Sequence, residues 1–86
     1  MITKEYIIRA PEGIHARPAA ALVKLTRQFK AAIHLQKGEK KVLLNSLLNL
    51  LSVGAKGGDT ITLSIEGEDE SGAAEALDRF FNELKE

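Results

Sequence analysis

Cysteine is absent from the 86-residue chain, and this absence excludes several kinds of chemistry. A chain without thiols has no disulfides, no thiolate metal ligands and no thiol nucleophile, and it is compatible with a reducing cytoplasm. His34 is expected on the solvent face of a strand, where a single histidine has no second ligand to complete a metal site. We therefore expect a cytoplasmic protein with no bound metal and no cofactor.

Net charge is also lacking, because twelve Lys and Arg balance twelve Asp and Glu. No net field draws such a chain to nucleic acid or to an anionic membrane, so any anion binding must be local. No stretch approaches the ~18 consecutive apolar residues of a membrane span, and residues 1–5 lack the apolar region of a signal peptide. We expect no nucleic-acid partner and no membrane insertion.

The length leaves room for one small domain, residues 1–86, with a modest core. Alternating, β-branched and aromatic residues predict strands at 2–9, 32–36, 40–44 and 60–66. Helical spacing of apolar residues predicts helices at 16–29, 46–53 and about 70–84. The helix caps are expected at Asn45 or Ser46 and at Asp69 or Ser71. This β-α-β-β-α-β-α order is typical of an α+β two-layer open sandwich.

The helix at 46–53 has more apolar residues than one buried face can hold. A core-facing stripe covers little more than ~100°, so we assign Leu50 and Val53 to the core. Leu47, Leu48 and Leu51 then form an exposed apolar patch, which on a small protein is typical of a docking surface. The alternative is a short helix that is buried nearly all round.

His15 lies at the entrance to the first predicted helix, where its imidazole is a candidate nucleophile. Pro11 and Gly13 predict a turn before it, and helical spacing begins after it. The first turn of a helix leaves the N–H groups of Ala16 and Arg17 without intrahelical partners. These donors, the helix dipole and the Arg17 guanidinium favour an anion, such as a phosphoryl group on the imidazole. The alternative is an ordinary surface or capping histidine.

The segment at 13–20, Gly-Ile-His-Ala-Arg-Pro-Ala-Ala, resembles the phosphorylation-site segment of HPr, the histidine-containing phosphocarrier of the bacterial phosphotransferase system. The chain length, the serine at position 46 before a leucine-rich stretch and the Gly-Glu-Asp-Glu run at 67–70 are also similar to that family. The resemblance implies an antiparallel sheet in the strand order 1-4-2-3, covered by three helices on one face. It further implies a monomeric carrier that is not an enzyme.

By this resemblance, His15 would accept a phosphoryl group from phosphorylated enzyme I, itself charged by phosphoenolpyruvate, and pass it to sugar-specific IIA domains. Family members carry the group on Nδ1, whereas the sequence does not determine which imidazole nitrogen reacts. Arg17 would stabilise charge, and the amides of Ala16 and Arg17 would bind phosphoryl oxygens. The residues assigned to partner contact are Ala20, Lys24, Arg27, Leu47, Leu48 and Leu51.

Ser46 matches a second family site. In HPr of many Gram-positive bacteria this serine is phosphorylated by an ATP-dependent HPr kinase/phosphorylase, and the product is a corepressor with a transcriptional regulator. Here Leu-Leu-Asn at 47–49 replaces the common Ile-Met-Gly, and Ser46 can equally be a plain helix cap.

Two further interpretations are weaker. A regulatory paralogue of HPr would lack the histidine that this chain has at His15. An RNA-binding KH-like module would use Gly-Ala-Lys-Gly at 54–57 as a backbone clamp between two helices. The predicted strand after this loop and the zero net charge disfavour such a module.

Overall fold

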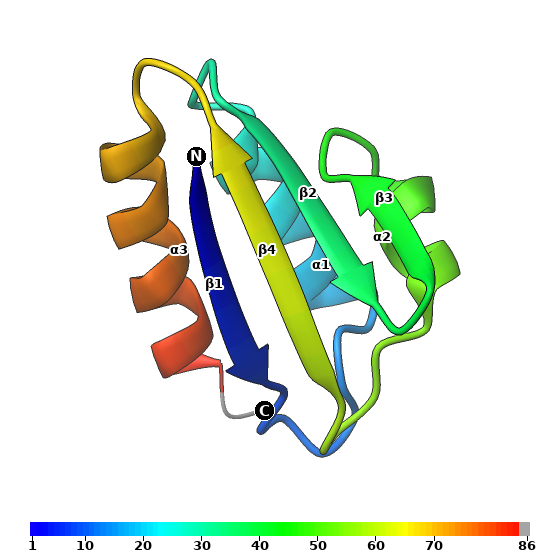
Figure 1. Cartoon of the computed structure of the whole chain (residues 1–86). Coiled ribbons are helices and arrows are strands. Elements are labelled where there is room, and N and C mark those ends of the chain that lie inside the picture. Colours follow the sequence, from blue (N-terminus) through cyan, green and yellow to red (C-terminus); the bar gives the residue numbers. More distant parts are fainter. Residues whose placement is uncertain (85–86) are drawn as a thin grey trace.

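The computed structural model describes residues 1–84, which form four strands and three helices (Figure 1). The strands are β1 (Ile2–Ile7), β2 (Ala32–Lys37), β3 (Lys40–Leu43) and β4 (Thr60–Glu66). The helices are α1 (Ala16–Thr26), α2 (Leu47–Val53) and α3 (Glu70–Glu83). No helix within these residues is both long and apolar enough to span a membrane.

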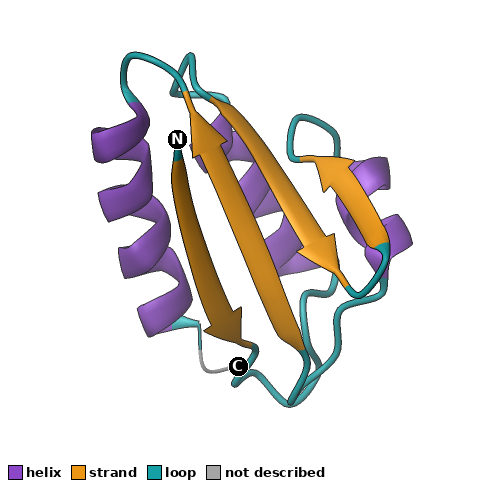
Figure 2. Cartoon of the chain, viewed as in Figure 1, coloured by secondary structure: helices purple, strands orange, loops and turns teal. Residues whose placement is uncertain are grey.

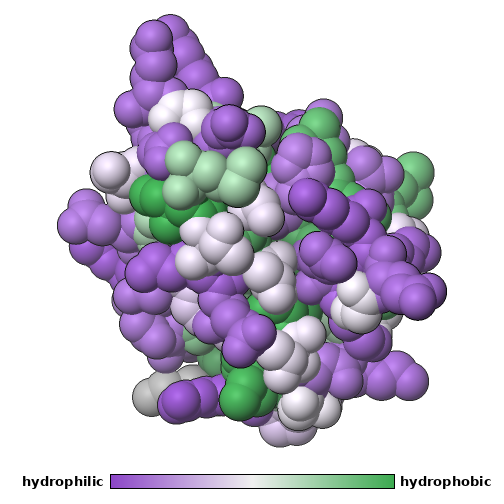
Figure 3. Space-filling model, in the orientation of Figure 1, coloured by the Kyte–Doolittle hydropathy of each residue, from purple (hydrophilic) through white to green (hydrophobic). Residues whose placement is uncertain are grey.

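The strands form one antiparallel sheet in the order β1-β4-β2-β3, as the resemblance implied. All three helices lie on one face of this sheet, and the other face is open (Figure 2). The open face is largely hydrophilic (Figure 3) because Thr62 and Ser64 of β4 alternate with inward residues. The α+β two-layer open sandwich is therefore confirmed.

The core lies between the sheet and the helices. Ile61, Leu63 and Ile65 of β4 point into it and are fully buried, as the alternation predicted. On α2, Leu50 is 1% exposed and Val53 is also buried, which confirms their assignment to the core. The helices bury small, branched and aromatic residues against this layer, including Ala19, Leu22, Val23, Ala73, Leu77 and Phe81.

Two elements are shorter by two or more residues than the sequence predicts. β1 ends at Ile7, although the N–H of Ile8 still donates to the carbonyl of Asp59 at 2.8 Å, in the same register; the chain then turns at Ala10, whose carbonyl accepts from the N–H of Gly13 at 2.9 Å. α1 ends at Thr26, whose buried hydroxyl lies 2.6 Å from the carbonyl oxygen of Leu44 and 2.9 Å from that of Val23. The hydrogen bond from Thr26 to the carbonyl of Leu44 thus links the end of α1 to a residue distant in sequence.

Asp69 is the N-cap residue of α3, but its side chain does not cap that helix. Its carboxylate accepts from the backbone N–H groups of Lys30 and Ala31, at 2.7 and 2.8 Å, and so joins the α1–β2 connection to the start of α3. The Lys30 N–H is the main reason that the pKa of Asp69 lies below its usual range. Glu70 instead accepts from the N–H of Gly67 at 3.1 Å, closing the turn before the helix.

Candidate functional site

His15 is the N-cap residue of α1, with an extended backbone at φ −90° and ψ −171°. Its carbonyl accepts the first helical hydrogen bond from Ala19, at 2.9 Å. The imidazole makes no capping hydrogen bond, and its side chain is 39% exposed. The backbone therefore starts the helix while the ring remains accessible for chemistry.

Ala16 and Arg17 are the first two residues of α1, and both are exposed. Within residues 1–84, no acceptor is paired with either backbone N–H. Arg17 also lines the same open groove as His15, together with Pro11, Glu12, Pro18, Ala21 and Leu84. The structure thus brings the predicted imidazole, amides and guanidinium to one surface, where the helix N-terminus favours an anion.

The loop before His15 is supported from behind by the loop between α2 and β4. Gly13 has φ +70°, and a Cβ at this position would overlap the carbonyl of Ala55. The next residue, Ile14, is buried and donates its N–H to the same carbonyl at 3.1 Å. A Cβ at Gly57 would likewise lie too close to the carbonyl oxygens of Ala10 and Pro11, at 2.7 and 2.8 Å. The two backbones are therefore packed directly together, without side chains between them.

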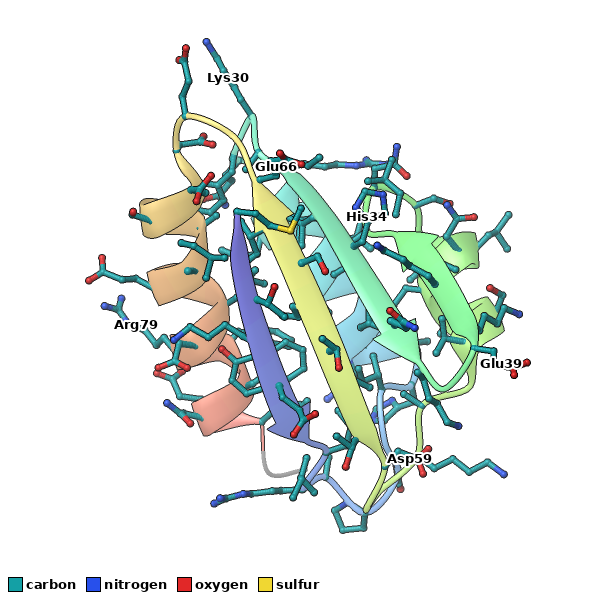
Figure 4. All side chains as sticks on the ribbon, viewed as in Figure 1. Lys30, His34, Glu39, Asp59, Glu66 and Arg79 are labelled. Atoms are coloured by element: carbon teal, nitrogen blue, oxygen red, sulfur yellow. The ribbon has the colours of Figure 1, made fainter. Side chains whose placement is uncertain are left out.

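Asp59 holds the supporting loop in place near the start of β4 (Figure 4). Its carboxylate accepts from the N–H of Lys56 at 2.7 Å and pairs with Lys37 Nζ at 2.8 Å. The hydrogen bond from Lys37, followed by that from Lys56, keeps the pKa of Asp59 below its usual range. Lys37 also donates to the carbonyl of Gly54 at 3.0 Å, so it fixes both ends of the loop.

Glu12 is a site residue that the sequence analysis missed. Its Oε2 lies 3.4 Å from Nε2 of His15, and both residues line the groove. The two side chains are three positions apart across a turn. Spacing alone gave no reason to single out this glutamate, since the turn that brings it to the ring depends on the backbone at Gly13.

A second groove lies between α1 and α2, and it contains four of the six residues predicted to contact partners. It is lined by Ala20, Val23, Lys24, Arg27 and Leu47. The other two, Leu48 and Leu51, are 80% and 38% exposed on α2. Leu47, Leu48 and Leu51 are therefore exposed, as the sequence predicts. We call the surface formed by the six residues the α1/α2 patch, comprising Ala20, Lys24, Arg27, Leu47, Leu48 and Leu51.

Arg27 has a structural contact that the sequence did not indicate. Its guanidinium donates to the carbonyl of Asn45, with an Nη2 distance of 2.8 Å, and so attaches α1 to the approach to α2. Ser46 then caps α2, with its hydroxyl 3.4 Å from the N–H of Asn49. Ser46, and not Asn45, is thus the cap residue. Arg27 of the α1/α2 patch therefore lies next to the cap of α2.

Charge is distributed unevenly along the chain although the total is zero. Residues 1–60 contain ten Lys and Arg against four Asp and Glu, whereas residues 61–86 contain two against eight. The first range includes α1 and α2, and the second includes α3. The α1/α2 patch therefore belongs to a cationic part of the molecule.

The fold is an antiparallel open-faced sandwich, and it displays an accessible histidine at the start of its first helix. These two features define a class of small proteins in which the histidine lies in an open groove. The family model described as "PTS HPr component phosphorylation site" matches residues 2–83. The chain belongs to the HPr family, the phosphocarrier proteins of the phosphotransferase system.

Individual relatives agree with this family. The chain is 40% identical over 84 residues to the phosphocarrier protein HPr of Lysinibacillus sphaericus, covering 98% of this chain and 96% of the relative. It is equally 40% identical to the HPr-like protein Crh of Halalkalibacterium halodurans, over 93% and 95% of the two chains. A crystal structure of HPr-C-His from Thermoanaerobacter tengcongensis superposes with a TM-score of 0.94 at 34% identity, covering 99% and 96%.

The KH-like interpretation fails on the structure. The loop at 54–57 leads from α2 into β4, not between two helices, and its backbone is occupied in supporting the segment before His15. A clamp for a nucleic-acid backbone needs a free glycine loop. The loop is instead part of the scaffold of the histidine site.

Proposed function

We propose that His15 accepts a phosphoryl group from phosphorylated enzyme I, itself charged by phosphoenolpyruvate, and passes it to IIA domains of sugar permeases. The observation that carries this proposal is the accessible imidazole beside two unpaired amides and Arg17 at the start of α1. The amides of Ala16 and Arg17 would bind phosphoryl oxygens, and the guanidinium would offset their charge. Membership of the HPr family supports the same assignment.

An open groove suits a carrier better than a closed pocket does. A carrier must stabilise its phosphorylated form only moderately, because a tightly held group would not leave for the next protein. Because His15 is accessible, a partner histidine can attack the phosphorus of the group that His15 carries. The phosphoryl group remains at the surface throughout. This chain would thus be a co-substrate of two transfer reactions in the cytoplasm and not itself an enzyme.

Incubation with enzyme I and labelled phosphoenolpyruvate tests this proposal. The label should enter the protein only when enzyme I is present, and it should be lost in acid and retained in base, as a phosphoramidate requires. An acid-stable label would indicate a phosphoester and would contradict a histidine carrier. Chase with an unlabelled IIA domain should remove the label from this protein and place it on that domain.

We propose that the α1/α2 patch is the surface on which enzyme I and IIA domains dock. Its exposed leucines supply an apolar centre, and Lys24 and Arg27 supply a cationic rim for acidic partner surfaces. Leu48, which is 80% exposed, has little core packing to lose in the free protein. Its apolar surface gains a partner only in the complex.

Leu48→Asp is therefore expected to weaken enzyme I binding by about tenfold or more, with a change in unfolding free energy of under about 0.5 kcal/mol. Leu50→Ala is the matched control on the same helix, since Leu50 is buried and its truncation should cost about 2–5 kcal/mol. Calorimetric titration and thermal unfolding of both variants give the comparison. A collapse of the melting temperature in Leu48→Asp would show that Leu48 is a core residue and not part of the docking surface.

We propose that Ser46 is a regulatory site that an HPr kinase/phosphorylase modifies, so that the product can bind a transcriptional regulator. The supporting observation is its position, half-buried at the start of α2 and immediately before Leu47 and Leu48. A negative charge is favourable at a helix N-terminus, so modification would leave the fold intact. The same charge would oppose docking of an acidic partner on the adjacent leucines.

Ser46→Asp should thus lower the apparent affinity for enzyme I by about threefold to tenfold while the melting temperature holds or rises slightly. Ser71→Asp is the control, because it adds the same charge near the start of α3, at the opposite edge of the sheet (Figure 1). Phosphotransfer rates against enzyme I concentration measure the effect. Equal rates for wild type and Ser46→Asp would leave Ser46 as a helix cap only.

A further inference from the structure

The two nitrogens of the His15 ring have different surroundings. Nε2 lies 3.4 Å from Oε2 of Glu12, whose side chain is 76% exposed. Among residues 1–84, no hydrogen bond or ion pair is formed at Nδ1. The other charged residue of the groove is Arg17, while Pro11, Pro18, Ala21 and Leu84 have no side-chain charge. Within residues 1–84, one edge of the ring therefore lies beside an anion and the other edge has no polar partner.

A carboxylate at this distance acts on the ring in two ways. It favours the tautomer in which the imidazole proton is on Nε2, and this leaves the lone pair on Nδ1. It also repels an anionic phosphoryl donor from the Nε2 edge. Both effects select the same nitrogen.

We propose that Glu12 is a positioning residue that keeps the proton of His15 on Nε2 and so directs phosphorylation to Nδ1. This inference rests on the proposed role of His15 as phosphoryl acceptor. Glu12 does not touch the phosphoryl group; it acts through the far edge of the ring. The cause is the carboxylate charge rather than the volume of the side chain.

The step balances in atoms and charge. The Nδ1 lone pair attacks phosphorus, and the P–N bond of the phosphohistidine donor breaks with its electron pair remaining on the donor nitrogen. The His15 ring keeps the proton on Nε2 and becomes cationic as the Nδ1–P bond forms. Glu12 faces that developing charge and stabilises it. When the phosphoryl group is passed on, the Nδ1–P bond breaks. The ring keeps its proton on Nε2 and is released as a neutral imidazole.

Potassium phosphoramidate provides a test that needs no protein partner, because this small reagent phosphorylates accessible imidazoles on either nitrogen with release of ammonia. The initial ratio of Nδ1 to Nε2 adducts at His15 is measured by ³¹P and ¹⁵N NMR. In Glu12→Gln, which keeps the side-chain size and removes the charge, the ratio should fall by about 1.5-fold to fivefold, the range expected for an exposed charge pair. Glu12→Asp should restore part of the wild-type ratio.

The chain offers two controls for this measurement. Glu39→Gln removes the same charge at the β2–β3 turn, far from the groove, and should leave the ratio at His15 unchanged (Figure 4). His34, on the open face of the sheet, is an internal reference whose ratio should be the same in every variant (Figure 4). If Glu12→Gln and Glu39→Gln changed the ratio at His15 equally, the net charge of the protein would be the cause, and the assignment to Glu12 would be overturned.

The proposal and the proposed function can fail separately. Equal ratios at His15 in wild type and Glu12→Gln would overturn the role of Glu12, whatever enzyme I does. A shifted ratio together with no label transfer from enzyme I would keep Glu12 as the residue that selects the nitrogen and would reject the carrier function. A ratio in Glu12→Gln shifted towards Nδ1 would contradict the electrostatic argument.

Discussion

Replacing His15 by alanine should abolish phosphoryl acceptance from enzyme I, lowering the rate by at least about a thousandfold, because no second histidine among residues 1–84 lines the groove. The fold should persist, with an unfolding free energy within about 1 kcal/mol of wild type, since the ring is accessible and makes no capping bond. Labelled phosphoenolpyruvate and thermal unfolding measure the two effects.

His34→Ala is the matched control for this experiment. His34 lies on β2, opposite Ser64 of β4 and Leu43 of β3, on the open face of the sheet. Its loss should leave the labelling rate unchanged. Label that persists in His15→Ala and disappears in His34→Ala would move the phosphorylation site to the sheet and would contradict the proposed carrier.

Gly13→Ala is expected to destabilise the fold by about 3–4 kcal/mol, which for a domain of this size lowers the melting temperature by roughly 15 °C or more. About 1–2 kcal/mol comes from a left-handed backbone with a Cβ, and the remainder from overlap with the carbonyl of Ala55. The variant should also lose phosphoryl acceptance at temperatures where it is still folded, because relief of the overlap shifts the segment before His15.

Gly38→Ala separates the two contributions to the loss of stability in Gly13→Ala. Gly38 has a similar φ of +61°, but nothing lies within 4 Å of a Cβ built there. It should therefore lose only the backbone part, about 1–2 kcal/mol. Similar losses in both variants, measured by denaturant unfolding, would show that the two loops are not in rigid contact.

The elements that could be predicted from the sequence are those with local periodicity. The alternation in β4 identified its inner face, and the angular spread of leucines on α2 separated Leu50 and Val53 from the exposed patch. The position of His15 before a helical run likewise placed the imidazole at the N-cap. In each case, the relevant geometry is set within a few residues.

The features that were missed depend on contacts between distant segments. Asp69 accepts from backbone groups some 38 and 39 positions away, so no local pattern distinguishes it from an ordinary cap. Lys37 and Asp59 meet only when the hairpin and the loop before β4 come together. Glu12 is near in sequence, yet its approach to His15 requires the positive φ at Gly13. The sequence supplies the chemical groups, and the tertiary fold decides which ones meet.

The central position of β4 has a consequence for synthesis of the protein. β1 pairs within the sheet only with β4, and the loop that supports the segment before His15 directly precedes β4. A nascent chain that has emerged only as far as α2 contains every residue of the groove between His15 and Arg17 but lacks the strand that fixes them. The support for the segment before His15 is therefore complete only when β4 has joined the sheet, so a chain truncated before β4 is expected to lack an ordered histidine site.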